Sequence, residues 1–435
     1  MTRAVIYLPD PTSRAAAATQ VAGRAMLVRT LMTAERAGVS RIGVPACLRA
    51  AAVEARIAAN PRLSAAVAWL DRLGAEGARR WSGGPLLLLP ANVLLDPLSV
   101  RRLLAARDPG DGIALEESKG SFSPILLASP ALSAAIWDRL VEGTPLGDEL
   151  ELRVRQGRMT LVVGAGFFVP VLDEATRSQA EATLFRSLGI SADSRVDRMI
   201  NRRCSRWLTR LLILLPVTPN QVTLLSLALG LGAAWMLWSA TQASALVGLA
   251  LYMLAVVVDH SDGEVARLTF QESAFGEWLD FTTDTVTHAG LVLGMGVTAS
   301  HVGGSVMVLA GAGAALGVIL SALFARFLPE EAAREERLAA VLKGLGTRDL
   351  FYTVLVAFLL GLWFAPPVLP VLVGLLAVGS QGFWLTCLGR SYFGGGLRPP
   401  DLGDARAEAS HLCGHPRHFR WRGSRQSPRS KGTPR

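Results

Sequence analysis

The sequence contains few cysteines and few charged residues. The four cysteines in 435 residues include no pair at CxxC spacing: Cys47, Cys204, Cys387 and Cys413. Neither a zinc site nor a disulfide framework is therefore indicated. Charged residues make up only 18% of the chain, and apolar residues make up 51%. This balance predicts a membrane protein with a soluble part, and the length leaves room for two or three domains.

A basic segment followed by an apolar core and a cleavage site is also lacking at the N-terminus, because the apolar run 4–8 is too short. We therefore expect the first part of the chain to stay in the cytoplasm. The net charge is +9, and many arginines adjoin apolar runs, which favours a membrane surface as the partner. A nucleic-acid-binding tail is the weaker alternative, because the basic C-terminal stretch has few aromatic residues for stacking.

Six apolar runs follow the soluble part, and most approach the ~20 residues that cross a bilayer. They cover 221–239, 243–262, 279–299, 304–327, 349–366 and 368–389. The loops after the first, third and fifth runs contain no Lys or Arg, whereas arginines border the opposite ends. By the positive-inside rule, we expect a multi-pass protein of the cytoplasmic membrane with both termini in the cytoplasm.

Composition divides the chain into four parts. We expect an α/β domain over 1–178, a basic amphipathic juxtamembrane linker over 179–217, an all-α six-helix transmembrane domain over 218–392 and a disordered basic tail over 393–435. The linker interleaves arginines with apolar residues, so it should lie on an anionic membrane surface.

Short apolar runs alternate with amphipathic stretches in the first part, which predicts an α/β fold with a mostly parallel sheet. The expected strands are Ala4–Leu8, Arg41–Val44, Leu86–Leu89, Pro124–Ala128 and Met159–Val163. The expected helices are Ala25–Ala37 and Ala65–Leu73.

Acidic residues gather where the sequence is otherwise apolar. The chain reads D-x-x-D-G-x-x-A-R from residue 259 and, after eight residues, G-x-x-x-D-x-x-x-D from residue 276. On helices, Asp259 and Asp262 share one face, and Gly276, Asp280 and Asp284 share another. A charge at membrane depth costs roughly 2.5–3.5 kcal/mol. Four carboxylates there indicate function rather than packing.

Carboxylates without His or Cys at ligand spacing suit hard cations such as Mg²⁺ or Mn²⁺, and Mg²⁺ often bridges carboxylates to substrate phosphates. A diphosphate is therefore a natural ligand. Gly263 and Gly276 lack a Cβ, so a nucleotide can approach the backbone there, and Arg267 could hold a phosphate. A polar seam in a helix bundle, or an ion path or scaffold without catalysis, are the alternatives. An ion path would spread its carboxylates through several spans.

These positions resemble the signature of the CDP-alcohol phosphotransferase (CDP-alcohol phosphatidyltransferase) family. The resemblance implies transfer from a CDP-linked donor to an acceptor alcohol with release of CMP, by a homodimer. It implies that Asp259, Asp262 and Asp280 bind a pair of Mg²⁺ or Mn²⁺ ions and that Asp284 is the base, with a contact to the second metal. The implied diphosphate-binding residues are Gly263, Ala266, Arg267 and Gly276.

The linker and the start of the first span carry a second resemblance. The passage from AEATLFRSLG to VTPNQVTLLSL resembles the linker of enzymes that fuse an inositol-phosphate cytidylyltransferase to a di-myo-inositol-phosphate-phosphate synthase. In the phosphotransferase family the TPNQVT segment borders the cytidine site, so Pro219, Asn220 and Thr223 are further candidate nucleotide contacts. A proline turn and a helix start explain the same residues equally well.

Recognition of the acceptor needs residues outside the signature. Arg326, Arg348 and Arg390 stand at span ends and could bind a phosphate on the acceptor, or each could be an interfacial anchor. His288 lies four residues after Asp284, so it could tune that carboxylate or bind the acceptor. A buried histidine with satisfied hydrogen bonds is the commoner outcome.

The first part resembles sugar nucleotidyltransferases over Val21–Val44 and Leu86–Asp96. It lacks their glycine-rich phosphate loop, since PDPTSRAAAATQ contains neither Gly nor Lys. Asn92 stands where the metal-binding aspartate is expected, and Asp96 and Arg14 are only partial substitutes. We expect a degenerate structural or regulatory domain, although a bifunctional enzyme that makes its own CDP-inositol is the alternative. Whether the donor is CDP-inositol or CDP-diacylglycerol stays open.

Overall fold

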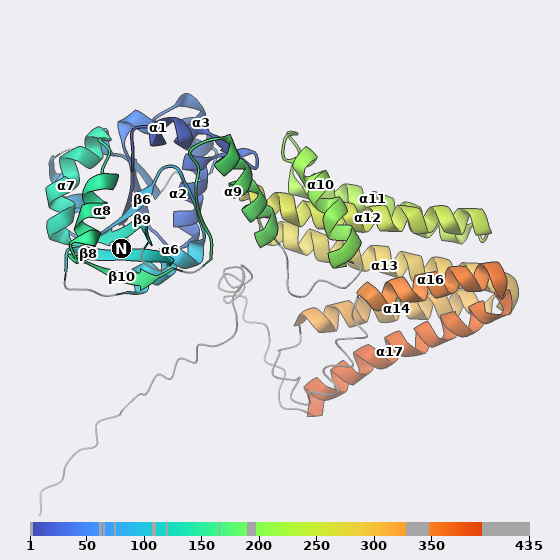
Figure 1. Ribbon diagram of the computed structural model, residues 1–435. Coiled ribbons are helices and arrows are strands. Elements are labelled where there is room, and N and C mark those ends of the chain that lie inside the picture. Colours follow the sequence, from blue (N-terminus) through green and yellow to red (C-terminus); the bar gives the residue numbers. More distant parts are fainter. Residues whose placement is uncertain are drawn as a thin grey trace, which may run out of the picture.

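The computed structural model describes residues 3–60, 63, 66–73, 75–106, 110–118, 121–164, 166–188, 197–327 and 348–393. These residues form an α/β part followed by a helical part (Figure 1). The tail predicted for 393–435 lies, apart from its first residue, outside the described residues.

A seven-stranded sheet with the order β10-β8-β9-β6-β1-β4-β5 forms the centre of the α/β part. Strands β5, β4, β1 and β6 are parallel neighbours, β9 is antiparallel to β6 and β8, and β10 is parallel to β8. The mostly parallel sheet expected from the alternating pattern is thus confirmed. The strands are β1 Arg3–Tyr7, β4 Arg41–Val44, β5 Val67–Trp69, β6 Leu86–Pro90, β8 Gly112–Ser118, β9 Ser121–Ala128 and β10 Met159–Val163.

Helices cover both faces of this sheet (Figure 1). Along β1, Ala4 and Ile6 belong to one buried cluster and Val5 and Tyr7 to the other, as the alternation of a strand requires. One face carries α2 Met26–Arg36, α3 Ala51–Ala58 and α6 Pro97–Ala105, and the other carries α5 Ala75–Ser82, α7 Pro130–Glu142 and α8 Gly147–Arg155. The sheet is therefore buried on both sides by the chain's own side chains.

The helix predicted over Ala65–Leu73 is wrong. Val67–Trp69 is strand β5, which pairs in parallel with β4, and a 3₁₀ turn over Leu70–Arg72 follows. A short apolar run cannot be assigned from periodicity alone. Here the open edge of the sheet next to β4 determines the outcome, because Val and Trp fit a pleated, half-buried surface.

Two short strand pairs lie beside the main sheet. Strand β7 (Val93–Leu95) pairs with β11 (Phe168–Pro170), and β2 (Gln20–Val21) pairs with β3 (Arg24–Ala25). The β2–β3 hairpin turns through Ala22 and Gly23, which have φ values of 44° and 75°. Positive φ at both central residues is the geometry of a tight two-residue hairpin. A Cβ on Gly23 would lie 3.0 Å from the carbonyl oxygen of Ile213, so this turn contacts the helical part directly.

The helical part begins with the linker and continues into a bundle. The linker comprises α9 Glu174–Ser187, η3 Asp197–Asn201 and α10 Arg202–Leu212, and α9 runs through the boundary predicted at 178/179. The bundle comprises α11 Pro219–Trp238, α12 Gln242–Thr269, α13 Ala274–Gly303, α14 Val306–Phe327, α16 Arg348–Phe364 and α17 Leu369–Phe393. Each predicted span falls on one of these helices.

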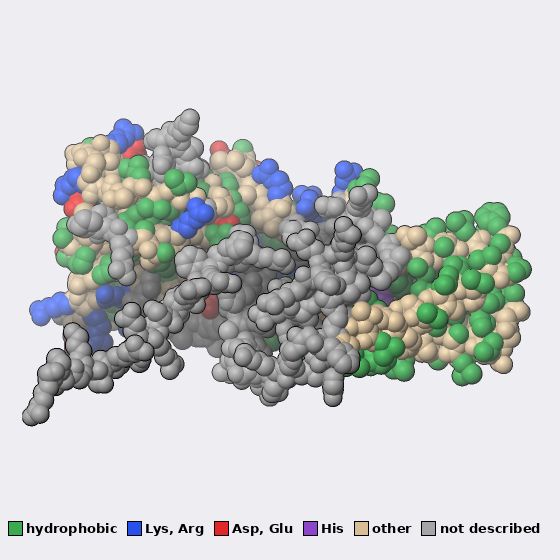
Figure 2. Space-filling model, turned by 90° about the horizontal axis from the view of Figure 1, so that it is seen from below, with side chains coloured by type: hydrophobic (Ala, Val, Ile, Leu, Met, Phe, Trp, Pro, Cys, Tyr) green, Lys and Arg blue, Asp and Glu red, His purple; other side chains and the backbone are tan. Residues whose placement is uncertain are grey.

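Four stretches of the described bundle are apolar and long enough to cross a membrane: Pro219–Trp238, Gln242–Thr269, Val306–Phe327 and Pro366–Thr386. Helix α16 contributes a shorter apolar helix over Phe351–Phe364. In Figure 2, apolar side chains cover the end of the bundle far from the α/β part, whereas the blue side chains lie on the α/β part and between it and the bundle. This distribution suits a helical part in lipid and an α/β part in water.

Small residues let the bundle helices approach closely. A Cβ on Gly296 of α13 would come within 2.6 Å of the Gly311 Cα on α14. Gly230 of α11 has Thr287 of α13 at a similar distance, because a Cβ there would lie 2.5 Å from that side chain. Close approach through glycine is the usual packing mode of helices in lipid, where apolar burial gives no driving force.

Candidate metal centre

The two halves of the aspartate motif lie on consecutive helices. Asp259 and Asp262 belong to α12, and Asp280 and Asp284 belong to α13. Phe270 ends α12 in the left-handed conformation with a φ of 60°, and the Ser273 hydroxyl accepts a hydrogen bond from the Gly276 amide at the start of α13. This short connection keeps the motif-bearing ends of the two helices together.

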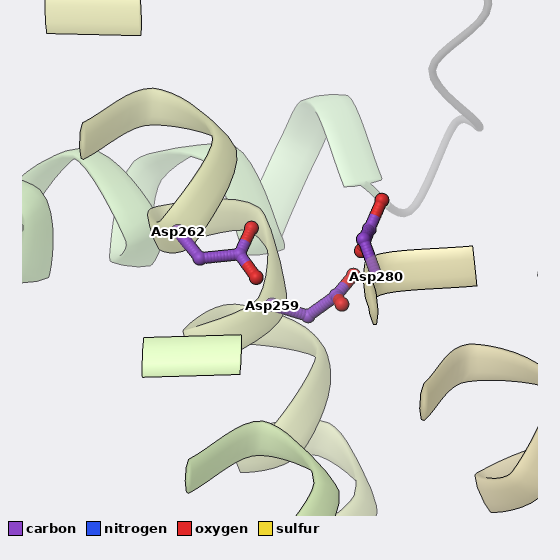
Figure 3. Close-up of side chains that lie close together, drawn as sticks. All are labelled: Asp259, Asp262 and Asp280. Carbon is purple, nitrogen blue, oxygen red and sulfur yellow. The ribbon is translucent and has the colours of Figure 1, made fainter. Parts of the chain in front are cut away.

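Three of the four aspartates converge. Asp259, Asp262 and Asp280 each offer a carboxylate oxygen, and these oxygens lie within 4.8 Å of one another (Figure 3). Asp259 is 8% exposed and Asp262 is 6% exposed. Carboxylates this close and this buried repel one another strongly unless a cation lies among them. An all-oxygen donor set fits a hard divalent cation such as Mg²⁺.

Asp284 is half-buried one turn beyond Asp280 on α13, and it is not one of the three converging carboxylates. The backbone carbonyl oxygen of Asp284 lies 2.8 Å from Nδ1 of His288. A carbonyl can only accept, so Nδ1 carries the proton, and Nε2 then accepts from the Tyr252 hydroxyl at 3.0 Å. The His288 ring also packs edge-on against Phe351 with the ring centres 4.5 Å apart. Both ring nitrogens of His288 are therefore used inside the protein.

The start of α11 also reaches this centre. The Thr223 hydroxyl donates to the Asp262 carboxylate. A Cβ on Gly276 would lie 3.2 Å from the Asn220 side-chain oxygen, so Asn220 stands beside the second half of the motif. Thr218 and Gln221 cap the helix reciprocally, with Pro219 at its first turn. The helix-start interpretation thus holds, and Thr223 of the same helix contacts a carboxylate of the cluster.

The structure describes the side chains of only some of the other candidate residues. The Arg267 guanidinium lies 3.4 Å from where a Cβ of Gly263 would stand, so the glycine leaves it room; Ala266 is half-buried beside it on α12. Arg326 pairs with Glu277 at 2.9 Å and lies over the rings of Trp278 and Phe281. Arg348 and Arg390 belong to α16 and α17, but their side chains lie outside the described residues.

The opposite face of α12 holds a polar contact that sequence reasoning missed. Glu264, inside the motif, is fully buried and pairs with Arg202 of α10 at 3.0 Å. The same carboxylate accepts from Ser205 at 3.0 Å and Thr209 at 2.8 Å. Residues 202, 205 and 209 follow helical spacing, so a polar stripe on the linker opposite an acid in an apolar run was the available signal.

A second missed contact involves His260, to which the sequence assigns no role. Its Nε2 lies 3.1 Å from the Asp197 carboxylate, which also accepts from Asn201 at 2.8 Å and Tyr352 at 3.0 Å. With Glu264, these residues fix the back face of α12 to η3, α10 and α16. One face of the linker helix is therefore docked on the bundle, while Trp207 on the other face is 64% exposed.

The site expected in the α/β part has a different character. The Asp10 carboxylate accepts from the backbone N–H groups of Thr12 at 2.8 Å and Ser13 at 3.0 Å. In a phosphate loop such amides bind the phosphate. Asn92 is 2% exposed, and Asp96 caps α6 by accepting from the Leu98 amide at 2.9 Å. Asp10 and Asp96 are thus engaged in local hydrogen bonds with the backbone.

Comparison with known proteins agrees with the helical site. Residues 216–387 match the model of the CDP-alcohol phosphatidyltransferase family. Residues 216–387 are a CDP-alcohol phosphatidyltransferase domain. The matched range includes α12 and α13, which carry the three converging aspartates.

Two curated relatives of this chain share the name bifunctional IPC transferase and DIPP synthase. The protein from Rubrobacter xylanophilus is 38% identical over 195 residues, which is 44% of this chain and 40% of that protein. The protein from Thermococcus kodakarensis is 35% identical over 94 residues, 22% of this chain and 21% of that protein. The matches thus span less than half of either relative.

A solved structure resembles the α/β part. It is a putative glucose-1-phosphate thymidylyltransferase from Bacillus anthracis, with a TM-score of 0.33 and 10% identity, covering 42% of this chain and 94% of that one. A score this low carries no argument about the activity of the α/β part.

Proposed function

We propose that this protein is a membrane CDP-alcohol phosphotransferase. It moves a phosphoryl-linked alcohol or phosphatidyl group from a CDP-activated donor to an acceptor alcohol and releases CMP, in phospholipid or inositol phosphodiester synthesis. The observation that carries the proposal is the convergence of Asp259, Asp262 and Asp280 within 4.8 Å at one end of an apolar bundle. The bundle crosses the membrane six times, with its aspartate end and both termini in the cytoplasm, and the protein acts as a homodimer.

The chain's own residues have distinct roles in this reaction. Asp259, Asp262 and Asp280, together with Asp284, would hold a pair of divalent ions, Mg²⁺ or Mn²⁺. When bound, the metal neutralises the donor diphosphate and the CMP leaving group. Arg267 binds a phosphate, Gly263, Ala266 and Gly276 leave room for the nucleotide, and Pro219, Asn220 and Thr223 border the cytidine.

Asp284 accepts the proton of the acceptor hydroxyl as that oxygen forms its bond to phosphorus. The bond between phosphorus and the CMP oxygen breaks, so one phosphodiester and CMP result. His288 positions Asp284 through its backbone carbonyl, and Arg326 stands near the acceptor side, held by Glu277. We also propose that Arg348 and Arg390 bind a phosphate on the acceptor.

The names of the curated relatives favour an inositol-type donor for the helical domain. The α/β part does not make that donor in our proposal, because Asp10 occupies the amides at the expected phosphate loop and Asn92 is buried. It resembles a nucleotidyltransferase in fold only. An ion path is disfavoured, because α11, α14 and α17 contain no Asp or Glu that would continue the path across the bilayer.

The test is CMP release by the purified full chain in detergent with Mg²⁺. CDP-inositol or CDP-diacylglycerol is offered with inositol phosphate, glycerol phosphate or serine as acceptor. We expect release that needs one donor, one acceptor and Asp284, with Asp284→Asn inactive. Folded protein that releases no CMP with any pair would refute the assignment.

A further inference from the structure

A cavity separates the α/β part from the chain that leads into the bundle. Its volume is about 460 Å³, within the usual range for small-ligand sites. Arg24 of the β2–β3 hairpin, Arg56 of α3 and Arg177 of α9 line it, opposite the stretch 213–216 between α10 and α11. Helix α9 stands between the two parts of the molecule (Figure 1). The cavity lies apart from the metal centre, because none of the aspartates lines it.

The charges around this cavity are unbalanced. Glu181 is its acidic residue, and that carboxylate already accepts from Arg177 at 2.9 Å and from the Ala22 amide at 2.9 Å. Within the described part of the chain, neither Arg24 nor Arg56 pairs with a carboxylate. Burial, and after it the charge of Arg56, lowers the pKa of the Arg24 guanidinium. Two half-buried cations that repel each other are costly unless an anion binds between them.

The cavity lies close to the start of a candidate membrane span, which favours a phosphate group as the bound anion. Leu214 is 76% exposed and Leu215 is 54% exposed, and both line the cavity. They come just before α11, which starts a candidate span at Pro219. Exposed leucines directly before a span place this side of the cavity at the membrane surface, where phosphate headgroups lie.

We propose that this cavity is a binding site for a phosphate group, carried by an anionic phospholipid headgroup or by a soluble phosphate ester. Arg24 and Arg56 supply the guanidinium groups, which match phosphate oxygens in pairs. Arg177 completes the basic wall while neutralising Glu181.

The buried side chain of Arg29 connects the site to the helix that carries the first half of the aspartate motif. Arg29 donates to the carbonyls of Val21 at 2.7 Å and Ala22 at 2.8 Å, in the hairpin that carries Arg24. It also donates to the carbonyl of Leu268 at 3.1 Å, at the end of the motif helix α12. A phosphate on Arg24 therefore stabilises the hairpin that holds this end of α12, and we expect binding to raise the unfolding temperature of the full chain.

The experiment uses the full chain in lipid nanodiscs with EDTA, so that the carboxylate cluster holds no metal. One arm titrates inorganic phosphate in phosphatidylcholine discs, and the other replaces phosphatidylcholine with phosphatidylglycerol. Unfolding temperature is measured for wild type, for Arg24→Gln/Arg56→Gln, and for the control Arg80→Gln/Arg155→Gln, which removes the same charge from exposed positions.

We expect stabilisation of wild type and the control, with an apparent affinity at least tenfold weaker in Arg24→Gln/Arg56→Gln. A response to phosphate identifies a soluble ester as the ligand, and a response to phosphatidylglycerol alone identifies a lipid headgroup. Equal responses of wild type and the cavity variant, or no response of wild type in either arm, would overturn the proposal. If the double variant does not fold, Arg56→Gln must weaken binding while Arg24→Lys, which keeps the charge, retains it.

Discussion

The sequence leads one to expect a nucleotide site in each of the two parts of this protein, and the acidic residues at the two places are used differently. On α12 and α13, three aspartate side chains converge on one another (Figure 3). In the α/β part, Asp10 occupies the loop amides, and Asp96 is used as a helix cap. The buried clusters on the two faces of the sheet do not include that loop's polar groups, so the sheet does not depend on them. Fold and function are separable here.

The largest expected effect contrasts the two sites directly. Asp284→Asn should lower the rate of CMP release by about 10²–10⁴-fold, because a general base contributes roughly that much. Asp96→Asn in the α/β part should leave the rate within about twofold, since a capping side chain there contributes only stability. Initial rates of CMP release at saturating Mg²⁺ measure both, and EDTA should abolish release in either protein. A comparable loss of rate from Asp96→Asn would mean that the α/β part takes part in the reaction.

The second-largest expected effect concerns Glu264, on the face of α12 opposite the carboxylate cluster. Glu264→Gln leaves Arg202 buried without its counter-charge, which should cost about 3–5 kcal/mol of stability. Replacing both partners, in Arg202→Met/Glu264→Gln, should recover part of that loss. Thermal unfolding in detergent measures it, with Arg155→Ala as the control, because an exposed pair contributes only about 0–1 kcal/mol. A single variant as stable as that control would refute the importance of the buried pair.

Loss of a contact between the α/β part and the helical part should lower the stability of the protein by a smaller but measurable amount. Arg29→Met removes hydrogen bonds to Val21, Ala22 and Leu268, and bonds from a charged group contribute roughly 1.5–3 kcal/mol. Arg36→Met, its neighbour on α2, removes a more exposed pair with Glu272 and should cost at most about 1 kcal/mol. Chemical denaturation in detergent ranks the two variants, and the reverse order would contradict the structure.

The smallest expected effect tests the support of the metal centre. Thr223→Val removes the hydroxyl that donates to Asp262 while keeping the shape of the side chain. Loss of such a supporting bond typically weakens metal affinity about 10–100-fold. The Mg²⁺ concentration for half-maximal CMP release should rise accordingly, with little change at saturating metal. Thr282→Val, an exposed helix residue bonded only to its own turn, is the matched control.

Sequence alone predicted the elements that local spacing determines. Asp259 and Asp262 share a helix face because of a three-residue spacing, and no distant contact is needed to know it. Strands β4 and β10 were predicted with their observed bounds, because short runs rich in apolar residues mark them. Contacts between distant segments were not predictable in this way. Arg202 and Glu264 are 62 residues apart, and strand β5 depends on the sheet edge that it joins.

The interface between the α/β part and the helical part prevents the chain from being cut into two pieces without exposing buried side chains. Ala22, Phe185 and Leu268 form one buried apolar cluster, drawn from the hairpin, the linker helix and the end of the motif helix. A transferase domain cut free at the linker would expose Leu268 to water beside its own active site, and an isolated α/β part would expose the hairpin turn. Each part supplies side chains to the other's interior, so the α/β part is a structural component of the helical part as well as its neighbour in sequence.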